Sequence, residues 1–331
     1  AGVPSGQDGG VIPDAEVLLA DAHVVRLPLV TRFRGVTERE ALLLRGPAGW
    51  GEFSPFPEYP AEVAARWLAA ALEAACVGLP EPKRDRIAVN VTVPAVDPDT
   101  ARRLVRASKA RTAKVKVAEP GQTEADDLAR LEAVREALGP DGKLRVDANA
   151  AWDVPTAEER IRHMAVYGLE YVEQPVATIE EMRRLRREVD VPLAADELIR
   201  RLPDPLVVAE QEAADVVVLK VQPLGGPRRA LEVAQRCGLP VVVSSALETS
   251  VGMAAGVAVA AALPDLPYAC GLGTVSLLAS DVVADPLEPC DGYVEVRRPV
   301  PDPAALERLR PDDATAAGLI ERLRSAGEVL T

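Results

Sequence analysis

Residues 112–149, TAKVKVAEPGQTEADDLARLEAVREALGPDGKLRVDAN, contain one complete strand–helix–strand unit. The β-branched run at residues 112–117 predicts a strand, and the apolar residues near i, i+3 and i+4 at 124–138 predict a helix. A second strand is predicted at residues 144–148. Because a helix connects the two strands, we expect them to run parallel in one sheet.

The same alternation of strand and helix recurs along the chain from about residue 86 onward. The pattern predicts an α/β fold with a parallel sheet, and by itself it fits an open sheet as well as a closed barrel. Further strands are predicted at residues 87–93, 169–173, 193–196, 216–221, 241–244 and, on a poorer pattern, 268–274. Further helices are predicted at residues 157–167, 179–188, 228–237 and 253–263.

The two ends of the chain have a different character. The C-terminal part, residues 283–331, is too short to fold alone, so we expect it to join residues 15–85 in one α+β cap over a barrel of residues 86–282. Residues 1–14 are expected to be a flexible end. The cap is predicted to hold strands at 16–27, 40–45 and 292–297, a loop rich in Gly, Pro and aromatic residues at 46–60, a helix at 61–75 and two short C-terminal helices.

Composition excludes several classes of protein. The 331 residues include 38 Lys+Arg and 51 Asp+Glu, and the net charge of −13 argues against nucleic acid or an anionic membrane as partner. No apolar run approaches the roughly 18 residues of a membrane span, so we expect a cytoplasmic protein. Two histidines and four scattered cysteines argue against a histidine-based zinc site, Ser-His-Asp catalysis and a disulfide framework. Nothing in the sequence indicates an oligomeric state.

Polar side chains end five successive predicted strands. In a parallel barrel the carboxyl ends of the strands meet on one face, so these side chains are expected to lie together although they are far apart in sequence. The alternative is that each caps a helix in its own βα loop. The residues are Lys114 and Lys116, Asp147 and Asn149, Glu173, Asp196 and Glu197, and Lys220 and Gln222.

Three of these residues, Asp147, Glu173 and Asp196, form a set of carboxylates without histidine. Converging carboxylates need a compensating cation, and hard oxygen ligands favour Mg²⁺, with Mn²⁺ as a substitute. The alternative is a set of structural ion pairs with Arg145 or Arg200.

The lysines are a second signal, because only six of the 38 basic residues are lysine. Lys114 and Lys116 are two apart on a strand and so point to one face. Two like charges beside a metal ion are expected to lower the pKa of each amine towards that of a general base. With Lys220 on a strand across the barrel mouth, the set suggests removal of a proton alpha to a carboxylate. The alternative for any one of them is a solvated surface charge.

The ordered motifs Lys114-x-Lys116, Asp147-Ala148-Asn149, Glu173-Gln174-Pro175, Asp196-Glu197 and Lys220-Val221-Gln222-Pro223 resemble the enolase superfamily, in particular its muconate-lactonizing subgroup. The resemblance implies a (β/α)7β barrel with an α+β cap. It implies that Asp147, Glu173 and Asp196 bind Mg²⁺, with Asn149, Glu197 and Gln222 around them, and that Lys116 and Lys220 are the acid/base pair. Lys114 would tune Lys116, and Arg145 would orient its amine.

Within this subgroup the cap loop is expected to set the substrate. Residues 51–59, GEFSPFPEY, and 244–250, SSALETS, resemble the dehydratases that convert 2-succinyl-6-hydroxy-2,4-cyclohexadiene-1-carboxylate to 2-succinylbenzoate in menaquinone biosynthesis. Phe53, Ser54 and Phe56 would then cover a ring-bearing carboxylate substrate, and Ser244 and Ser245 would bind its succinyl carboxylate. The aromatic cluster equally fits packing in the core of the cap.

Two alternative functions are weighed. An N-acylamino acid racemase or epimerase would use Lys116 and Lys220 as two bases on opposite faces of its substrate. A non-catalytic binding protein would be expected to have lost at least one of the five polar strand ends, and all five are chemically intact.

Overall fold

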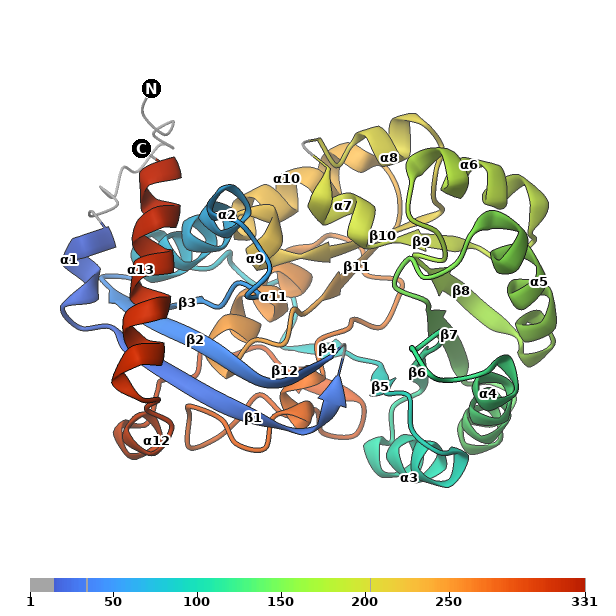
Figure 1. Ribbon diagram of the computed structural model, residues 1–331, viewed down its shortest axis with the longest axis horizontal. Helices are drawn as coiled ribbons and strands as arrows, with labels where there is room; N and C mark the ends of the chain where they lie inside the picture. Colours follow the sequence, from blue (N-terminus) through green and yellow to red (C-terminus); the bar gives the residue numbers. More distant parts are fainter. Residues whose placement is uncertain (1–14, 34, 203, 331) are drawn as a thin grey trace.

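The computed structural model describes residues 15–33, 35–202 and 204–330, and its centre is a seven-stranded parallel sheet (Figure 1). The strands lie in the order β11-β10-β9-β8-β7-β6-β5, so strands that follow one another in the chain are neighbours in the sheet. This confirms the predicted α/β class with a parallel sheet. The strands are β5 (Val91–Val93), β6 (Thr112–Lys116), β7 (Lys143–Asp147), β8 (Leu169–Glu173), β9 (Leu193–Ala195), β10 (Val216–Lys220) and β11 (Val241–Ser244).

Helices connect the strands and surround the curved sheet in Figure 1. Two of them, α4 and α6, have the predicted bounds because each begins at a capping box, formed by Thr123 with Asp126 and by Thr178 with Glu181. The helices are α3 (Pro98–Ser108), α4 (Glu124–Leu138), α5 (Val154–Met164) with a 3₁₀ turn (Ala165–Tyr167), α6 (Ile179–Glu188), α7 (Glu197–Arg201), α8 (Val207–Glu210), α9 (Val221–Leu224), α10 (Pro227–Cys237) and α11 (Ser250–Ala262).

The two edges of the sheet are joined by isolated bridges rather than by a regular eighth strand. Cys270 forms one parallel bridge to Val89, and Gly271 forms one to Ser244. The predicted strand at residues 268–274 is therefore reduced to these two positions, followed by a 3₁₀ turn (Thr274–Leu277). The cause is local, because glycine weakens a strand and a side chain at Gly271 would collide with Ser244.

Helices α1 and α13, the first and last described elements, lie side by side at one end of the molecule in Figure 1. Helix α13 packs on α2 and on β2. A separate two-stranded sheet pairs β4 (Arg86–Ala88) with β12 (Tyr293–Glu295). The elements are α1 (Ala15–Leu19), β1 (His23–Phe33), β2 (Val36–Gly46), β3 (Gly49–Phe53), α2 (Ala61–Leu72) with a π-helical turn (Glu73–Val77), α12 (Pro303–Arg308) and α13 (Asp313–Leu330).

Three predictions for the ends were wrong in detail. The strand predicted at residues 16–27 begins only at His23, because the helix-forming residues before it form α1. The loop predicted at residues 46–60 contains β3, which pairs antiparallel with β2 and uses Gly51 where a side chain would collide with the Ala71 carbonyl of α2. The last helix is 18 residues long rather than short. Residues 1–14, predicted to be flexible, lie outside the described residues.

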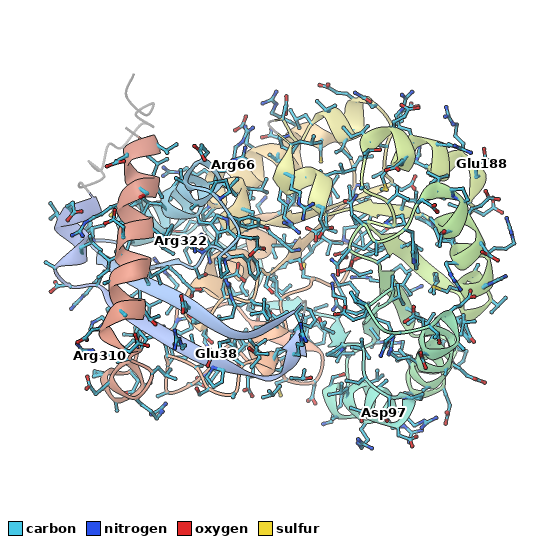
Figure 2. All side chains as sticks on the ribbon, in the orientation of Figure 1. Glu38, Arg66, Asp97, Glu188, Arg310 and Arg322 are labelled. Atoms are coloured by element: carbon cyan, nitrogen blue, oxygen red, sulfur yellow. The ribbon has the colours of Figure 1, made fainter. Side chains whose placement is uncertain are left out.

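Two main apolar cores hold these elements together. One lies between the parallel strands and their helices, where strands β6, β10 and β11 are buried along their whole length. The other lies under the three-stranded sheet and contains Phe53, Trp67 and Leu323. Charged side chains such as Asp97 and Glu188 stand at the periphery (Figure 2). No helix among the described residues is long and apolar enough to cross a membrane.

Candidate active site

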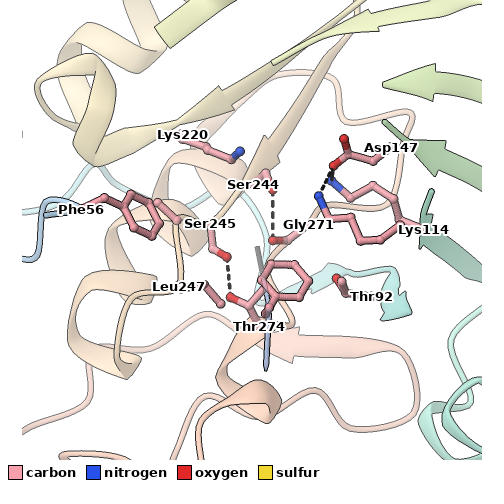
Figure 3. Close-up of a pocket in the computed structure, with 13 residues that line it drawn as sticks. Phe56, Thr92, Lys114, Asp147, Lys220, Ser244, Ser245, Leu247, Gly271 and Thr274 are labelled. Carbon is pink, nitrogen blue, oxygen red and sulfur yellow. Dashed lines mark hydrogen bonds and ion pairs between the residues drawn. The ribbon is translucent and has the colours of Figure 1, made fainter. Parts of the chain in front are cut away.

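A small pocket lies at the carboxyl ends of the parallel strands, where the strand-end side chains were expected to meet (Figure 3). Its water-accessible volume is about 30 Å³, which is room for a few water molecules. In Figure 3, Lys220 lies across the pocket from Lys114 and Asp147. The lining residues are Phe33, Phe56, Thr92, Lys114, Lys116, Asp147, Lys220, Ser244, Ser245, Ala246, Leu247, Gly271 and Thr274.

The carboxylates predicted to bind metal stand on neighbouring strands. Asp147 and Glu173 are register partners on β7 and β8, and Asp196 follows β9 directly. All three side chains are buried. The three carboxylates therefore lie in the same order as their strands in the sheet, because they stand at the ends of β7, β8 and β9 respectively.

Ammonium groups contact each of these carboxylates. Lys116 Nζ lies 2.5 Å from Asp147 Oδ2, and Lys114 Nζ lies 2.7 Å from Glu173 Oε1 and 3.3 Å from Asp147 Oδ2. On the other side, Lys220 Nζ lies 2.5 Å from Asp196 Oδ2. The three lysines are themselves nearly buried, at 5–6% exposure, so these pairs are shielded from water.

The pKa values within this cluster follow from burial and charge. Burial, with the neighbouring carboxylates of Asp147 and Asp196, raises the pKa of Glu173 to about 7, although the ammonium groups of Lys114 and Lys220 act to lower it. Burial lowers the pKa of Lys114, but the carboxylates of Glu173 and Asp147 outweigh this effect, so its pKa lies above the ordinary lysine value. For Lys114 the direction is thus opposite to the predicted one, because the carboxylates lie closer to it than the sequence could indicate.

Whether these residues fit a divalent cation depends on donor chemistry and on arrangement. Within residues 15–33, 35–202 and 204–330 no three His, Cys, Asp or Glu side chains are arranged as a ready metal site. The donors nevertheless fit a hard cation, because Asp147, Glu173 and Asp196 offer only oxygen and are close enough for the charge of the outer two to raise the pKa of the middle one. To hold a cation together, they would have to exchange their ammonium partners for it.

Asn149 and Glu197 stand beside the carboxylates, as predicted. Lys116 Nζ donates to Asn149 Oδ1 at 2.8 Å, and Asn149 Nδ2 donates to Glu197 Oε1 at 3.3 Å. Arg200 donates to Glu197 Oε1 at 2.6 Å and lies 3.5 Å from Asp196 Oδ1. The ion pairs with Arg200 that were weighed as an alternative to metal binding are therefore present at Asp196.

Gln174 connects the end of β8 to the backbone after β9. It belongs to the Glu173-Gln174-Pro175 motif, but no role was predicted for it. Its Oε1 accepts from the backbone N–H groups of Asp196 and Leu198, at 3.0 and 3.1 Å. Its φ of 38°, one residue after β8, is in the left-handed region, and Asn149, two residues after β7, has a φ of 48°. Non-glycine residues adopt this region at a cost, which is typical of functional sites.

The residues predicted around the substrate fall into two groups. Phe56, Ser244 and Ser245 line the pocket, and the Ser245 hydroxyl is hydrogen bonded to that of Thr274. Phe53 packs in the apolar core under the three-stranded sheet, in line with the packing role weighed as the alternative for the aromatic cluster. Ser54 is buried and forms hydrogen bonds with Glu52 and Gln222.

Gln222 therefore contacts the loop that precedes α2 rather than the carboxylates. Its Oε1 accepts from Ser54 N at 3.4 Å and its Nε2 donates to Ser54 Oγ at 3.2 Å. This links the end of β10 to the cap.

The contacts that the structure describes for Arg145 are with groups other than the Lys116 amine, which this arginine was predicted to orient. Its Nε donates to Glu170 at 2.6 Å, one Nη1 hydrogen bond reaches Ala269 O at 2.8 Å, and the guanidinium lies 4.6 Å from the ring centroid of Tyr171. These contacts indicate a structural role for Arg145 inside the sheet.

Six lining residues were not predicted as site residues, namely Phe33, Thr92, Ala246, Leu247, Gly271 and Thr274, and two of them come from the β1–β2 hairpin and the edge strand β5. Phe33 ends β1, and Lys116 Nζ lies 5.4 Å from its ring centroid. Thr92 lies on β5 and also lines the pocket. Nothing in the sequence signals either, because their position depends on how the β1–β2 hairpin and the edge of the sheet meet.

The comparisons with known proteins agree with this architecture. The family model described as enolase C-terminal domain-like matches residues 98–302, and the one described as enolase N-terminal domain-like matches residues 24–75. The chain belongs to the enolase superfamily. The resemblance inferred from the strand-end motifs is thereby confirmed.

Within the enolase superfamily, the chain is similar to curated enzymes with one name. It is 60% identical over 302 residues to the o-succinylbenzoate synthase of Thermobifida fusca (strain YX), covering 91% of this chain and 95% of that protein. It is 51% identical over 322 residues to the o-succinylbenzoate synthase of Mycobacterium tuberculosis (strain H37Rv), covering 97% and 98%. That name denotes a lyase, a dehydratase of menaquinone biosynthesis.

Solved structures of superfamily members confirm the fold. A muconate lactonizing enzyme from Pseudomonas fluorescens matches with a TM-score of 0.75 at 23% identity, covering 88% of this chain and 98% of that one. A dipeptide epimerase from Enterococcus faecalis matches with a TM-score of 0.70 at 21% identity, covering 85% and 96%. At this identity the likeness concerns the fold alone.

Proposed function

We propose that this chain is a Mg²⁺-dependent dehydratase that converts 2-succinyl-6-hydroxy-2,4-cyclohexadiene-1-carboxylate to 2-succinylbenzoate. The observation that carries the proposal is the 51–60% identity, over more than nine-tenths of the chain, to enzymes named o-succinylbenzoate synthase. The pocket supports it, because two buried lysines, Lys116 and Lys220, stand on different strands around one cavity. Menaquinone biosynthesis in the cytoplasm is the setting that goes with this reaction.

The proposal includes the predicted organisation of the chain. In this proposal residues 15–85 and 283–331 form the cap and residues 86–282 form a (β/α)7β barrel, and the isolated bridges at Cys270 and Gly271 support the meeting of its two sheet edges. The family models, which match residues 24–75 and 98–302, support such a division.

Lys116 is the proposed base. Its neutral amine takes the ring proton alpha to the substrate carboxylate, and the electron pair of that C–H bond moves into the enediolate. The resulting ammonium then gives its proton to the hydroxyl that leaves from the same ring face, so that water departs and the ring becomes aromatic. One side chain thus serves both proton transfers in a syn elimination.

Lys220 acts from the other side of the pocket. It remains an ammonium group and stabilises the negative charge of the enediolate, an effect that is strong in a buried site. Asp147, Glu173 and Asp196 would hold Mg²⁺, with Mn²⁺ as a substitute, and the ion would supply positive charge to the substrate carboxylate. Ser244 and Ser245 would donate to the succinyl carboxylate.

The substrate must enter by rearrangement of the pocket walls. A water-accessible volume of about 30 Å³ is too small for a substituted six-membered ring. Movement of the loop that carries Phe56 would enlarge the pocket, and its closure would exclude water from the reacting atoms.

A second activity, racemisation of N-acylamino acids, is favoured by one observation. Lys116 and Lys220 line the same pocket from strands β6 and β10, which is the arrangement needed for two bases on opposite faces of a carbon acid. The two proposals separate in one experiment, in which the protein with Mg²⁺ is given the cyclohexadiene substrate or an N-succinylamino acid in D₂O. We expect rapid formation of 2-succinylbenzoate that EDTA abolishes, and racemisation without dehydration would overturn the first proposal.

A further inference from the structure

We propose that Arg39 is a positioning residue that fixes two adjacent walls of the substrate pocket; the inference rests on the proposed function. The first wall is the cap loop, residues 54–60 between β3 and α2. The second is the β11 loop, residues 245–249 between β11 and α11. Neither the strand-end motifs nor the acid/base pair includes this arginine.

Hydrogen bonds from Arg39 reach the backbone of both loops. Its Nη2 donates to Ser54 O of the cap loop at 2.5 Å. Its Nε donates to Leu247 O at 3.2 Å, and Nη2 also reaches Ala246 O at 3.4 Å, both in the β11 loop. The side chain is only 3% exposed, so these bonds form away from water, where leaving a carbonyl unpaired is costly.

The same guanidinium packs on a side chain that faces the substrate. It lies over the Phe56 ring, 4.2 Å from the centroid, and a desolvated cation on an aromatic face is a favourable contact. Phe56, Ala246 and Leu247 all line the pocket that holds Lys116 and Lys220. Arg39 therefore stands behind the pocket wall and holds three of its lining residues in place.

We call Arg39 and its bonds to the two loops the clamp. Two buried carboxylates, Glu52 and Glu248, add to it. Glu52 of β3 accepts from Thr249 Oγ1 at 2.5 Å and from Gly252 N at 3.0 Å at the start of α11. Glu248 accepts from Ala246 N at 2.6 Å. Burial lowers the pKa of Arg39, and both carboxylates oppose this effect. They thus hold the β11 loop and also stabilise the charge of Arg39.

Backbone strain indicates that the β11 loop is held rather than relaxed. Leu247 has a φ of 63°, in the left-handed region that a leucine adopts only at a cost. Its carbonyl is the one that accepts from Arg39 Nε. Removing this donor is therefore expected to let the loop relax and to change the width of the pocket.

Arg322 of α13 offers a matched control. Its guanidinium donates to Pro55 O, Phe56 O and Tyr59 O at 2.9–3.3 Å, so Arg322, labelled in Figure 2, binds the cap loop from α13. Its hydrogen bonds do not include the β11 loop. Arg322→Met therefore loosens one wall, whereas Arg39→Met loosens both.

Hydrogen exchange measured by mass spectrometry tests the clamp without reference to any reaction. We expect Arg39→Met to speed amide exchange in both residues 54–60 and 245–249, and Arg322→Met to speed it in residues 54–60 alone. Unchanged exchange in the β11 loop of a folded Arg39→Met protein would overturn the inference. Should Arg39→Met fail to fold, Arg39→Lys, which keeps the charge but loses the fork of donors, replaces it in the same comparison.

Steady-state kinetics then test the role in positioning. We expect Arg39→Met to raise KM for the cyclohexadiene substrate by about tenfold or more while kcat changes less, because binding geometry and not proton transfer is altered. Arg39→Lys should recover part of the loss, and Arg322→Met should change KM by no more than about twofold. Equal KM values for the wild type and Arg39→Met would overturn the role of Arg39 in positioning the substrate. A wild type without dehydratase activity would overturn the proposed function instead. The hydrogen-exchange result would then decide whether Arg39 holds the two loops.

Discussion

Lys116 Nζ lies 2.5 Å from Asp147 Oδ2, across the neighbouring strands β6 and β7. The same relationship holds between Lys220 and Asp196 on the other side of the site, also at 2.5 Å. In each pair, a lysine proposed for the reaction forms an ion pair with a carboxylate proposed to bind the metal. Any cation that binds the carboxylates must compete with these ammonium groups, and any base must first lose this partner.

Replacement of Lys116 tests the proposed base. We expect Lys116→Ala to lower kcat by about 10² to 10⁴-fold, since this is the usual contribution of a positioned base. The variant should also fail to exchange the alpha proton of a bound carbon acid in D₂O. Lys143, which is exposed at the start of β7, is the control, and Lys143→Ala should retain wild-type rates. Normal turnover by Lys116→Ala would remove this lysine from the mechanism.

Loss of one carboxylate tests the metal site. We expect Asp147→Asn, Glu173→Gln and Asp196→Asn each to weaken Mg²⁺ binding at least about tenfold, because each removes a charged oxygen ligand. Calorimetric titration with Mg²⁺ measures this directly. Glu180→Gln, an exposed change on α6, should bind Mg²⁺ like the wild type. Wild-type affinity in all three carboxylate variants would place the ion elsewhere.

Glu52 is expected to make stability depend on pH. Burial raises its folded-state pKa to about 7, from an unfolded value near 4.3. Between these values the folded state binds more protons than the unfolded state, so the stabilising contribution present below about pH 4.3 is lost as pH rises through about 7. The difference is on the order of 3 kcal/mol.

Denaturant unfolding of the wild type and Glu52→Gln at a series of pH values checks this. The free energy of unfolding of the wild type should fall relative to Glu52→Gln between about pH 4.3 and 7, and the difference should then level off. A difference that does not vary with pH would show that Glu52 titrates normally.

Replacement of Arg145 tests whether its role is structural or catalytic. Its side chain is fully buried against Glu170 and two tyrosines, so we expect Arg145→Met to lower the free energy of unfolding by about 3 kcal/mol. The fraction that remains folded should keep kcat within about tenfold of the wild type. A large loss of kcat with unchanged stability would instead restore the role predicted from sequence.

The sequence predicted the parts of the site that depend on strand periodicity. Asp147, Glu173 and Lys220 end short apolar runs that are one or two strand–helix units apart, so the topology of a parallel sheet is enough to bring them to one edge. The position of Lys116 in the pocket wall was predictable for a related reason, because side chains two residues apart on a strand point to the same face.

Contacts between the two ends and the sheet could not be predicted in this way. Phe53 ends β3 and Phe56 lies three residues later in the cap loop, yet only Phe56 lines the pocket, whereas Phe53 is enclosed in the core under the three-stranded sheet. Arg39 was not singled out, since the chain is rich in arginine and its partners are backbone carbonyls far along the chain. The pKa of Lys114 likewise depends on a distance of 2.7 Å that no sequence pattern encodes.

The most direct test of the central claim is a crystal structure of the protein with Mg²⁺ and 2-succinylbenzoate. We expect one ion bound by oxygens of Asp147, Glu173 and Asp196, and the aromatic ring of the product between the amines of Lys116 and Lys220. An ion bound away from these carboxylates, or a product whose ring lies outside the space between the two amines, would contradict the account.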